Sequence, residues 1–126
     1  MSNANETTDD ALLRGRAINP RPLTIERYAA LITKGESSTL ELKRSTGELR
    51  EAMQTLCAFA NGKGGRVLIG VKPNGELVGQ QVSEQTFHEI AAQRDRFEPP
   101  IEFEIDCVEV APKYAICCHI AESVMR

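Results

Sequence analysis

Two glutamates and a lysine in the first half of the chain have the side-chain types and spacing that could do chemistry. Glu36, Glu41 and Lys43 form the pattern E-x-x-x-x-E-x-K. Carboxylate oxygens are the ligands that Mg²⁺ and Mn²⁺ prefer, and a neighbouring lysine can bind phosphate or transfer a proton. These three residues are therefore candidate catalytic residues, and Glu36 and Glu41 are candidate metal ligands.

A short strand over residues 39–43 would position these side chains. Its two leucines alternate with Glu41 and Lys43, and successive side chains of a strand point to opposite faces. The alternation therefore aligns the charged residues on one face. We place Glu36 in the loop that enters the strand, from which it can turn toward Glu41.

An amphipathic helix is expected directly after this strand. Apolar residues recur at helical spacing over residues 49–60, and Ser45 or Thr46 supplies the cap at the helix start. Asn61 and Gly62 should close the helix, because both tolerate the left-handed conformation that ends many helices.

A glycine-rich turn over residues 61–65 and two short strands should follow the helix. The apolar run over residues 66–71 predicts a strand buried on both faces. The turn signal at residues 73–75 predicts that residues 76–79 return as a neighbouring strand. Because the glycines follow a helix instead of preceding one, they lack the polarity of a P-loop, and ATP binding is not expected.

Basic residues in the same segment make it a candidate nucleic-acid surface. Lys43, Arg44, Asn61 and Lys63 would contact a nucleic acid if the strand end and the glycine turn lie together. Such contacts give weak, salt-sensitive and sequence-independent binding. Glutamates interleave with the basic residues, so composition alone equally allows a solvated surface of mixed charge.

Together these motifs resemble the Schlafen-type Alba-like domain, AlbA_2, also catalogued as the divergent AAA_4 domain. The residues that carry the resemblance are Glu36, Glu41, Lys43, 57–61, 64–71 and 74–79. The resemblance implies an α+β fold and a DNA-binding role at the N-terminus of bacterial transcriptional regulators, often ahead of a winged helix-turn-helix. It also implies kinship with the Schlafen proteins that cut tRNA and rRNA.

In the nuclease members of this family, the two glutamates of the motif and an aspartate just after the Ile-Gly-Val strand form the active site. This chain has Lys72 and Pro73 in place of the aspartate, so that only Glu76, across the turn, could replace it. A hydrolytic metal site needs several oxygen ligands. The resemblance therefore leaves a metal-dependent endoribonuclease as an alternative function.

Length, charge and cysteine spacing are those of one cytoplasmic domain. The 126 residues suffice for one hydrophobic core, and a net charge of −3 argues against a dedicated nucleic-acid clamp. The four cysteines lack zinc-binding or C-x-x-C spacing, which indicates buried free thiols in a reducing compartment. We recognise no signal peptide or membrane-spanning run and expect a cytoplasmic protein with no membrane partner.

The flanking segments complete the expected domain. Residues 1–20 are polar and predict a disordered or arm-like lead-in to a domain over residues 21–126, which we interpret as a fragment of a longer regulator. A helix over residues 23–34 should end at Gly35. A further helix, capped by Ser83, should extend to about Phe97.

A hairpin should complete the sheet. Apolar and acidic residues alternate over residues 101–107, which predicts a strand with one wet, acidic face. An apolar strand over residues 114–121 should return beside it. The sequence as a whole predicts an α+β fold, with a mixed or antiparallel sheet of about five to six short strands and about three helices packed on it.

Three functional hypotheses follow from these observations. The first is a self-associating, nucleic-acid-binding regulatory domain of a transcriptional regulator. The second is the Mg²⁺- or Mn²⁺-dependent endoribonuclease. The third is a protein–protein interaction module, in which the acidic strand within residues 101–110 meets a partner subunit.

Overall fold

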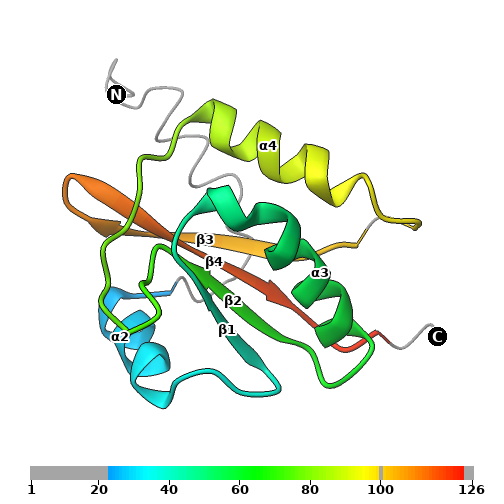
Figure 1. Ribbon diagram of the computed structural model, residues 1–126, viewed down its shortest axis with the longest axis horizontal. Helices are drawn as coiled ribbons and strands as arrows, with labels where there is room; N and C mark the ends of the chain where they lie inside the picture. Colours follow the sequence, from blue (N-terminus) through cyan, green and yellow to red (C-terminus); the bar gives the residue numbers. More distant parts are fainter. Residues whose placement is uncertain (1–22, 100, 124–126) are drawn as a thin grey trace, which may run out of the picture.

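A four-stranded mixed sheet forms the centre of the computed structural model, which describes residues 23–99 and 101–123 (Figure 1). Its strands are β1 (Leu40–Lys43), β2 (Gly65–Ile69), β3 (Glu104–Val110) and β4 (Lys113–Ile120). Their order across the sheet is β1-β2-β4-β3, with β1 parallel to β2 and the other two pairs antiparallel. The predicted α+β class is confirmed, as are the first strand, the buried strand and the final hairpin.

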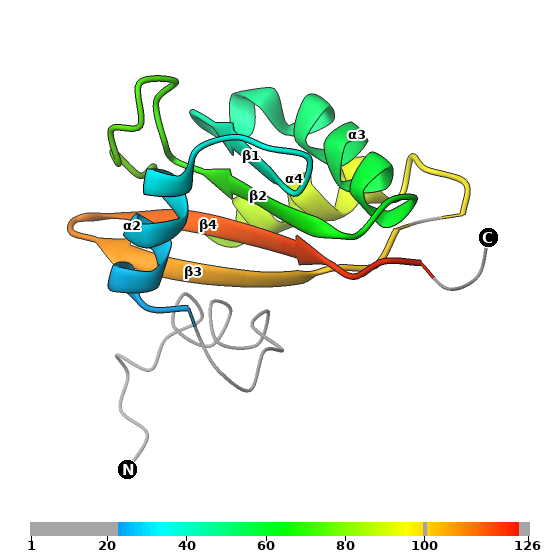
Figure 2. The same cartoon turned by 90° about the horizontal axis from the view of Figure 1, so that it is seen from below.

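Three α-helices in the described residues pack on this sheet: α2 (Ile25–Lys34), α3 (Leu49–Ala60) and α4 (Glu84–Arg94). A short 3-10 turn, η1 (Thr46–Glu48), leads into α3. Figures 1 and 2 show α3 and α4 together over one face of the sheet and α2 on the other side. None of the helices in this part of the chain has the length and apolar content needed to cross a membrane.

The two faces of the sheet support separate apolar clusters. The larger cluster joins the buried sides of α3 and α4 to strand residues such as Val67, Ile69 and Ile116. The smaller cluster joins Tyr28 of α2 to Leu68 and other residues on the opposite face. Burial on both faces explains why β2 is apolar throughout its second half.

Tyr28 connects α2 to the place where the central strands separate. Its side chain is fully buried, and its hydroxyl lies 3.1 Å from the carbonyl oxygens of both Ile69 and Ile116. These two residues form the last pair of the β2–β4 ladder. The hydroxyl thus ties α2 by hydrogen bonds to the ends of both central strands. Gly35 ends α2 with a φ of 77°, as predicted.

Helix α3 ends at Asn61 as predicted, but the expected left-handed conformation of Asn61 and Gly62 is wrong. Asn61 has an ordinary right-handed φ of −80°, and Gly64 is the residue with a positive φ, of 81°. A Cβ atom on Gly64 would lie 2.7 Å from the Ile120 carbonyl oxygen, and one on Gly65 would lie 2.7 Å from the Thr39 carbonyl oxygen. The glycines therefore let the turn pass close to the neighbouring backbone on both sides.

The sheet has four strands where about five to six were predicted, because residues 76–79 do not form a ladder. Only an isolated bridge joins Val71 to Leu77, and the amides of Val78 and Gly79 both donate to the single carbonyl of Gly70. Gly70 and Gly79 have positive φ values, which bend the chain out of the extended conformation. The predicted tight turn at residues 73–75 does form, since the Gly75 amide donates to the Lys72 carbonyl.

Two further boundaries differ from the prediction. Helix α4 ends at Arg94, before Phe97, and β3 begins at Glu104. The predicted wet face of this strand is confirmed at Glu104, whose side chain is 37% exposed, but is wrong at Asp106, which is only 6% exposed. Its face of the sheet carries Val108 and the apolar cluster around Tyr28. The predicted lead-in over residues 1–20 lies outside the described residues.

Candidate functional site

Four of the predicted site residues line one hollow of about 380 Å³ at the carboxyl end of β1: Glu36, Glu41, Lys43 and Arg44. We call it the strand-end hollow. Its other lining residues are Ile32, Gly35, Leu42, Glu48, Val71, Pro73, Asn74 and Gly75. The loop after α2, the edge strand, the start of α3 and the tight turn after β2 therefore meet at this point.

The charged face of β1 lies on the α3 side of the sheet. Glu41 pairs in register with Val67, and Lys43 with Ile69, and both partners belong to the core beneath α3. The predicted alternation of the strand is thereby confirmed. Because β1 is an edge strand, its long charged side chains can reach solvent at the rim of this core.

Lys43 is held between two carboxylates. Its Nζ atom lies 3.3 Å from Glu41 Oε2 and 3.9 Å from Glu48 Oε1, and its side chain is only 14% exposed. The second of these carboxylates also accepts the Arg44 backbone amide, at 3.0 Å, through Glu48 Oε2. The lysine charge is therefore already compensated within the protein.

Glu48 is a site residue that sequence reasoning missed. Its signal is present, because Ser45 and Glu48 have the S-x-x-E spacing of a capping box. Ser45 caps η1 by accepting the Gly47 amide, and Glu48 folds back to the strand end instead of facing outward. The short turn between β1 and α3 thus brings a third carboxylate to the strand-end hollow.

Glu36 occupies the entering loop, as predicted, and contacts β1 directly. Its Oε2 atom accepts the Leu42 backbone amide at 3.1 Å. An edge strand presents amides that have no strand partner, and this carboxylate covers one of them. Glu36 therefore ties the loop after α2 to the outer edge of the sheet.

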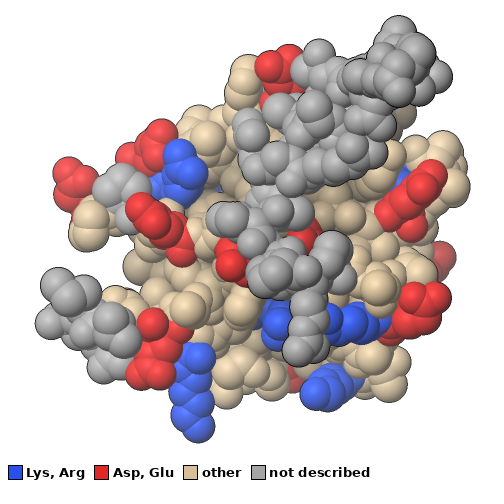
Figure 3. Space-filling model, turned by 180° about the vertical axis from the view of Figure 1, so that it is seen from behind, with Lys and Arg blue, Asp and Glu red and all other residues tan. Residues whose placement is uncertain are grey.

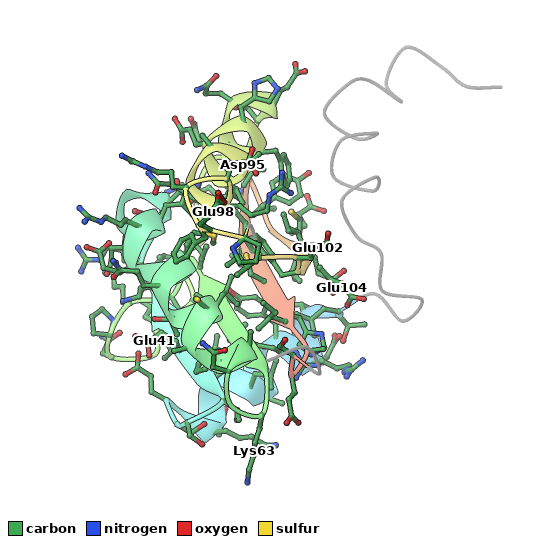
Figure 4. The ribbon with its side chains drawn as sticks, turned by 90° about the vertical axis from the view of Figure 1, so that its right-hand side faces the viewer. Glu41, Lys63, Asp95, Glu98, Glu102 and Glu104 are labelled. Carbon is green, nitrogen blue, oxygen red and sulfur yellow. The ribbon has the colours of Figure 1, made fainter. Side chains whose placement is uncertain are left out.

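Lys63 and Asn61 do not join this hollow. The glycine turn meets the opposite end of the strand, where the Arg66 amide donates to the Thr39 carbonyl at 2.9 Å. Figure 4 shows Glu41 and Lys63 extending from different parts of the molecule. The expectation that the strand end and the glycine turn lie together is wrong, because the parallel pairing places Lys43 beside Ile69 at the far end of β2. Asn61 lines a separate hollow with Phe97 and Glu98.

The carboxylates of the strand-end hollow are engaged with protein donors. In residues 23–99 and 101–123, no group of three or more His, Cys, Asp or Glu side chains is arranged to hold a metal ion. Glu76 does not line the hollow but pairs with Lys72 at 3.4 Å, so the missing aspartate is not replaced from across the turn. Metal binding by Glu36 and Glu41, and a catalytic role for them with Lys43, stay predictions.

The cysteines form no disulfide among the described residues, and two of them, Cys117 and Cys118, are fully buried. Burial raises the pKa of the Cys117 thiol to about 12, although the nearby Arg66 opposes part of the rise. Burial, with a smaller contribution from Asp106, raises the pKa of the Cys107 thiol to about 12 as well. These thiols are neutral near pH 7, and neutral thiols are poor nucleophiles.

Comparison with known proteins identifies the domain. The family model described as "Schlafen, AlbA_2" matches residues 36–126. The N-terminal domain of a RecG-related protein from Nitrosomonas europaea has a similar fold, with a TM-score of 0.59 and 23% identity over 75% of this chain and 72% of that one.

A second solved structure, the DIP2311 protein from Corynebacterium diphtheriae, has a TM-score of 0.53 and 9% identity over 79% of this chain and 26% of that one. No curated protein matches the chain. Both structural matches support the observed fold, and the family model covers most of the chain. The chain therefore belongs to the Schlafen AlbA_2 family.

Proposed function

We propose that this chain is a nucleic-acid-binding domain of a DNA-associated regulator, and that it binds phosphate backbones weakly and without sequence preference. Membership of the Schlafen AlbA_2 family supports a nucleic-acid-related role. The Nitrosomonas neighbour bears a name that describes an ATP-dependent DNA helicase, which is in keeping with DNA as the ligand. Self-association and attachment to a further regulatory domain stay predictions.

The observation that carries the proposal is a set of uncompensated cations along α3. Arg44 precedes the helix, Arg50 lies in its first turn, and Lys63 follows its end; all three are exposed. None of them forms an ion pair within the part of the chain that the structure describes. A helix of 12 residues is about 18 Å long, so Arg44 and Arg50 near its start and Lys63 after its end offer separate contacts to a phosphate backbone.

Lys43 has a different role in this proposal. Its ammonium group already contacts Glu41 and Glu48, so it organises the strand-end hollow and leaves Arg44 as the cation that faces solvent there. A buried and compensated charge contributes little to counterion release, which drives phosphate binding.

The remaining surface limits the affinity. The chain carries a net charge of −3. Figure 3 shows Lys and Arg side chains interspersed with Asp and Glu side chains on one face of the molecule. The described residues form no single continuous basic area on this face. Binding should therefore depend on a few local contacts and weaken steeply as salt rises.

The test is a fluorescence anisotropy titration with labelled DNA, single-stranded and duplex, at several salt concentrations. Three phosphate contacts predict a slope of log Kobs against log salt of about −3 on duplex DNA. The double variant Arg44→Gln/Lys63→Gln should make that slope less steep by about 2. A matched double variant, Arg27→Gln/Lys113→Gln, changes the charge equally on α2 and at the β3–β4 turn and should bind as the wild type does.

Two results would reject the proposal. One is the absence of wild-type binding even at about 50 mM salt, where counterion release is most favourable. The other is an equal loss for the two double variants, because it would show that net charge alone governs the interaction.

A further inference from the structure

A hollow of about 280 Å³ between α3 and α4 differs in chemistry from the strand-end hollow. Arg50 and Gln54 of α3 line it together with Gln93, Arg96 and Phe97 at the end of α4. We call it the helix groove. Its described lining consists of two guanidinium groups, two amides and one aromatic ring, and includes no carboxylate.

Regular structure holds the groove residues in place. Arg50 and Gln54 are one turn apart on α3 and therefore project from the same side of the helix. The Arg96 amide donates to the Gln93 carbonyl at 3.1 Å, which fixes the turn that follows α4. Phe97 packs against the larger apolar cluster, so its ring is a supported wall of the groove.

The positive charge of the groove is not compensated nearby. Asp95, the carboxylate next to Arg96, forms an ion pair with Arg94 at 3.1 Å. Glu98 lines the separate hollow around Asn61, and Figure 4 shows both carboxylates at the end of α4. Within residues 23–99 and 101–123, neither Arg50 nor Arg96 forms an ion pair.

We propose that the helix groove binds a phosphodiester of single-stranded nucleic acid, with Arg50 and Arg96 on the phosphate and an adjacent base against Phe97. This inference rests on the proposed function and specifies its ligand. Guanidinium groups match phosphate oxygens with paired hydrogen bonds, and the amides of Gln54 and Gln93 add donors and acceptors for phosphate or base. A base can lie against an aromatic ring only where it is unstacked, which selects a single strand over a duplex.

The test compares variants of the whole chain in anisotropy titrations with a short labelled oligothymidylate and with a duplex. Arg50→Gln/Arg96→Gln should weaken single-strand binding at least tenfold and reduce the salt slope by about 0.7, because the contact with one phosphate is lost. Phe97→Leu keeps an apolar side chain against the core but removes the ring face. It should weaken single-strand binding about tenfold and duplex binding much less.

The control is again Arg27→Gln/Lys113→Gln, which changes the net charge as much as the groove variant does. If the groove variant and this control bind oligothymidylate equally while the wild type still binds DNA, the groove assignment is overturned and the proposed function survives. If the wild type binds neither oligothymidylate nor duplex DNA, the groove assignment and the proposed function are both rejected. Circular dichroism and thermal melting should show every variant folded, because the arginines are surface residues and leucine retains the packing of Phe97.

A competition arm separates nucleic acid from other anions. Inorganic phosphate and a polyglutamate peptide are each titrated against the bound oligothymidylate. Weak displacement by both at matched ionic strength is expected, because neither supplies a base for Phe97. Displacement by polyglutamate as strong as by unlabelled oligothymidylate would assign the groove to acidic peptides and overturn the proposal.

Discussion

The strand-end hollow and the helix groove both adjoin the start of α3, yet their charges are arranged in contrasting ways. In the first, Lys43 lies between Glu41 and Glu48, and Glu36 accepts a backbone amide. In the second, Arg50 and Arg96 line a surface without a carboxylate. The hollow with more ionisable residues is thus the one whose charges, except that of Arg44, are already used inside the protein.

This contrast separates charges that hold the fold together from charges available to a ligand. A partly buried ion pair is costly to break from one side, since the other charge is left without a partner. An exposed arginine without a counter-ion costs the fold little to replace, but it can form strong hydrogen bonds to phosphate. Substitutions of the paired residues in the first hollow should therefore change stability, and those of Arg44 and of the second hollow should change binding.

Lys43→Met should give the largest effect on stability. The change leaves Glu41 and Glu48 facing each other without a cation, and we expect a loss of about 2 kcal/mol in the free energy of unfolding by urea. The matched change is Lys72→Met, which removes an exposed ion pair with Glu76 and should cost less than about 0.5 kcal/mol. Equal losses for the two variants would show that the strand-end hollow is ordinary surface.

Gln54→Glu adds a carboxylate to the helix groove, so that its cations are partly compensated as in the strand-end hollow. The new carboxylate would lie one turn from Arg50 and repel phosphate, so oligothymidylate binding should weaken about tenfold while stability changes by only about 0.3 kcal/mol. Gln81→Glu makes the same charge change in the loop before α4 and serves as the control. Unchanged binding by Gln54→Glu would contradict the assignment of the groove.

Glu36→Ala should have a smaller effect on stability. It removes the acceptor of the Leu42 edge amide in an exposed loop, and a loss of about 1 kcal/mol is expected from urea denaturation. DNA binding should persist, because the variant removes a negative charge from the side of the molecule that carries Arg44. Glu98→Ala, an exposed carboxylate at the end of α4, should leave stability within about 0.5 kcal/mol of the wild type.

The smallest effect on stability is expected from changes of pH within the range used for binding measurements. The core that both hollows share should stay intact over this range. The pKa of Cys107 and of Cys117 is raised to about 12 by burial, above the usual thiol value. Thiols of the unfolded chain therefore lose protons first as pH rises, and stability should fall progressively from about pH 9 toward about pH 12. Thermal melting should show no contribution from these thiols between about pH 6 and about pH 8.

Local patterns in the sequence predicted the individual elements of the site. The alternation around Glu41 and Lys43 gave the strand and its charged face, and the spacing after Glu36 placed this residue in the entering loop. The role of Glu48 could also have been suspected, because its sequence spacing from Ser45 is that of a capping box. These features depend on neighbours in the chain, for which spacing is sufficient.

The joint placement of distant segments was not predictable in the same way. The parallel pairing of β1 with β2 decides that Lys63 lies far from Lys43, and nothing in the local spacing specifies that pairing. Likewise, Arg50 and Arg96 meet in one groove only because α3 and α4 pack side by side. The predicted strand at residues 76–79 is missing for a different reason. Its turn signal was correct, but positive φ values at Gly70 and Gly79 bend the flanking chain away from the sheet.

The position of Tyr28 also affects where the domain can be truncated at its N-terminal side. The family match begins at residue 36, downstream of α2, but the buried Tyr28 hydroxyl of that helix donates hydrogen bonds to the carbonyl oxygens of Ile69 and Ile116. A chain trimmed to the matched region would lose this donor and the cover over one face of the sheet. We therefore expect a stable domain to include α2, which lies upstream of the region that the family model matches.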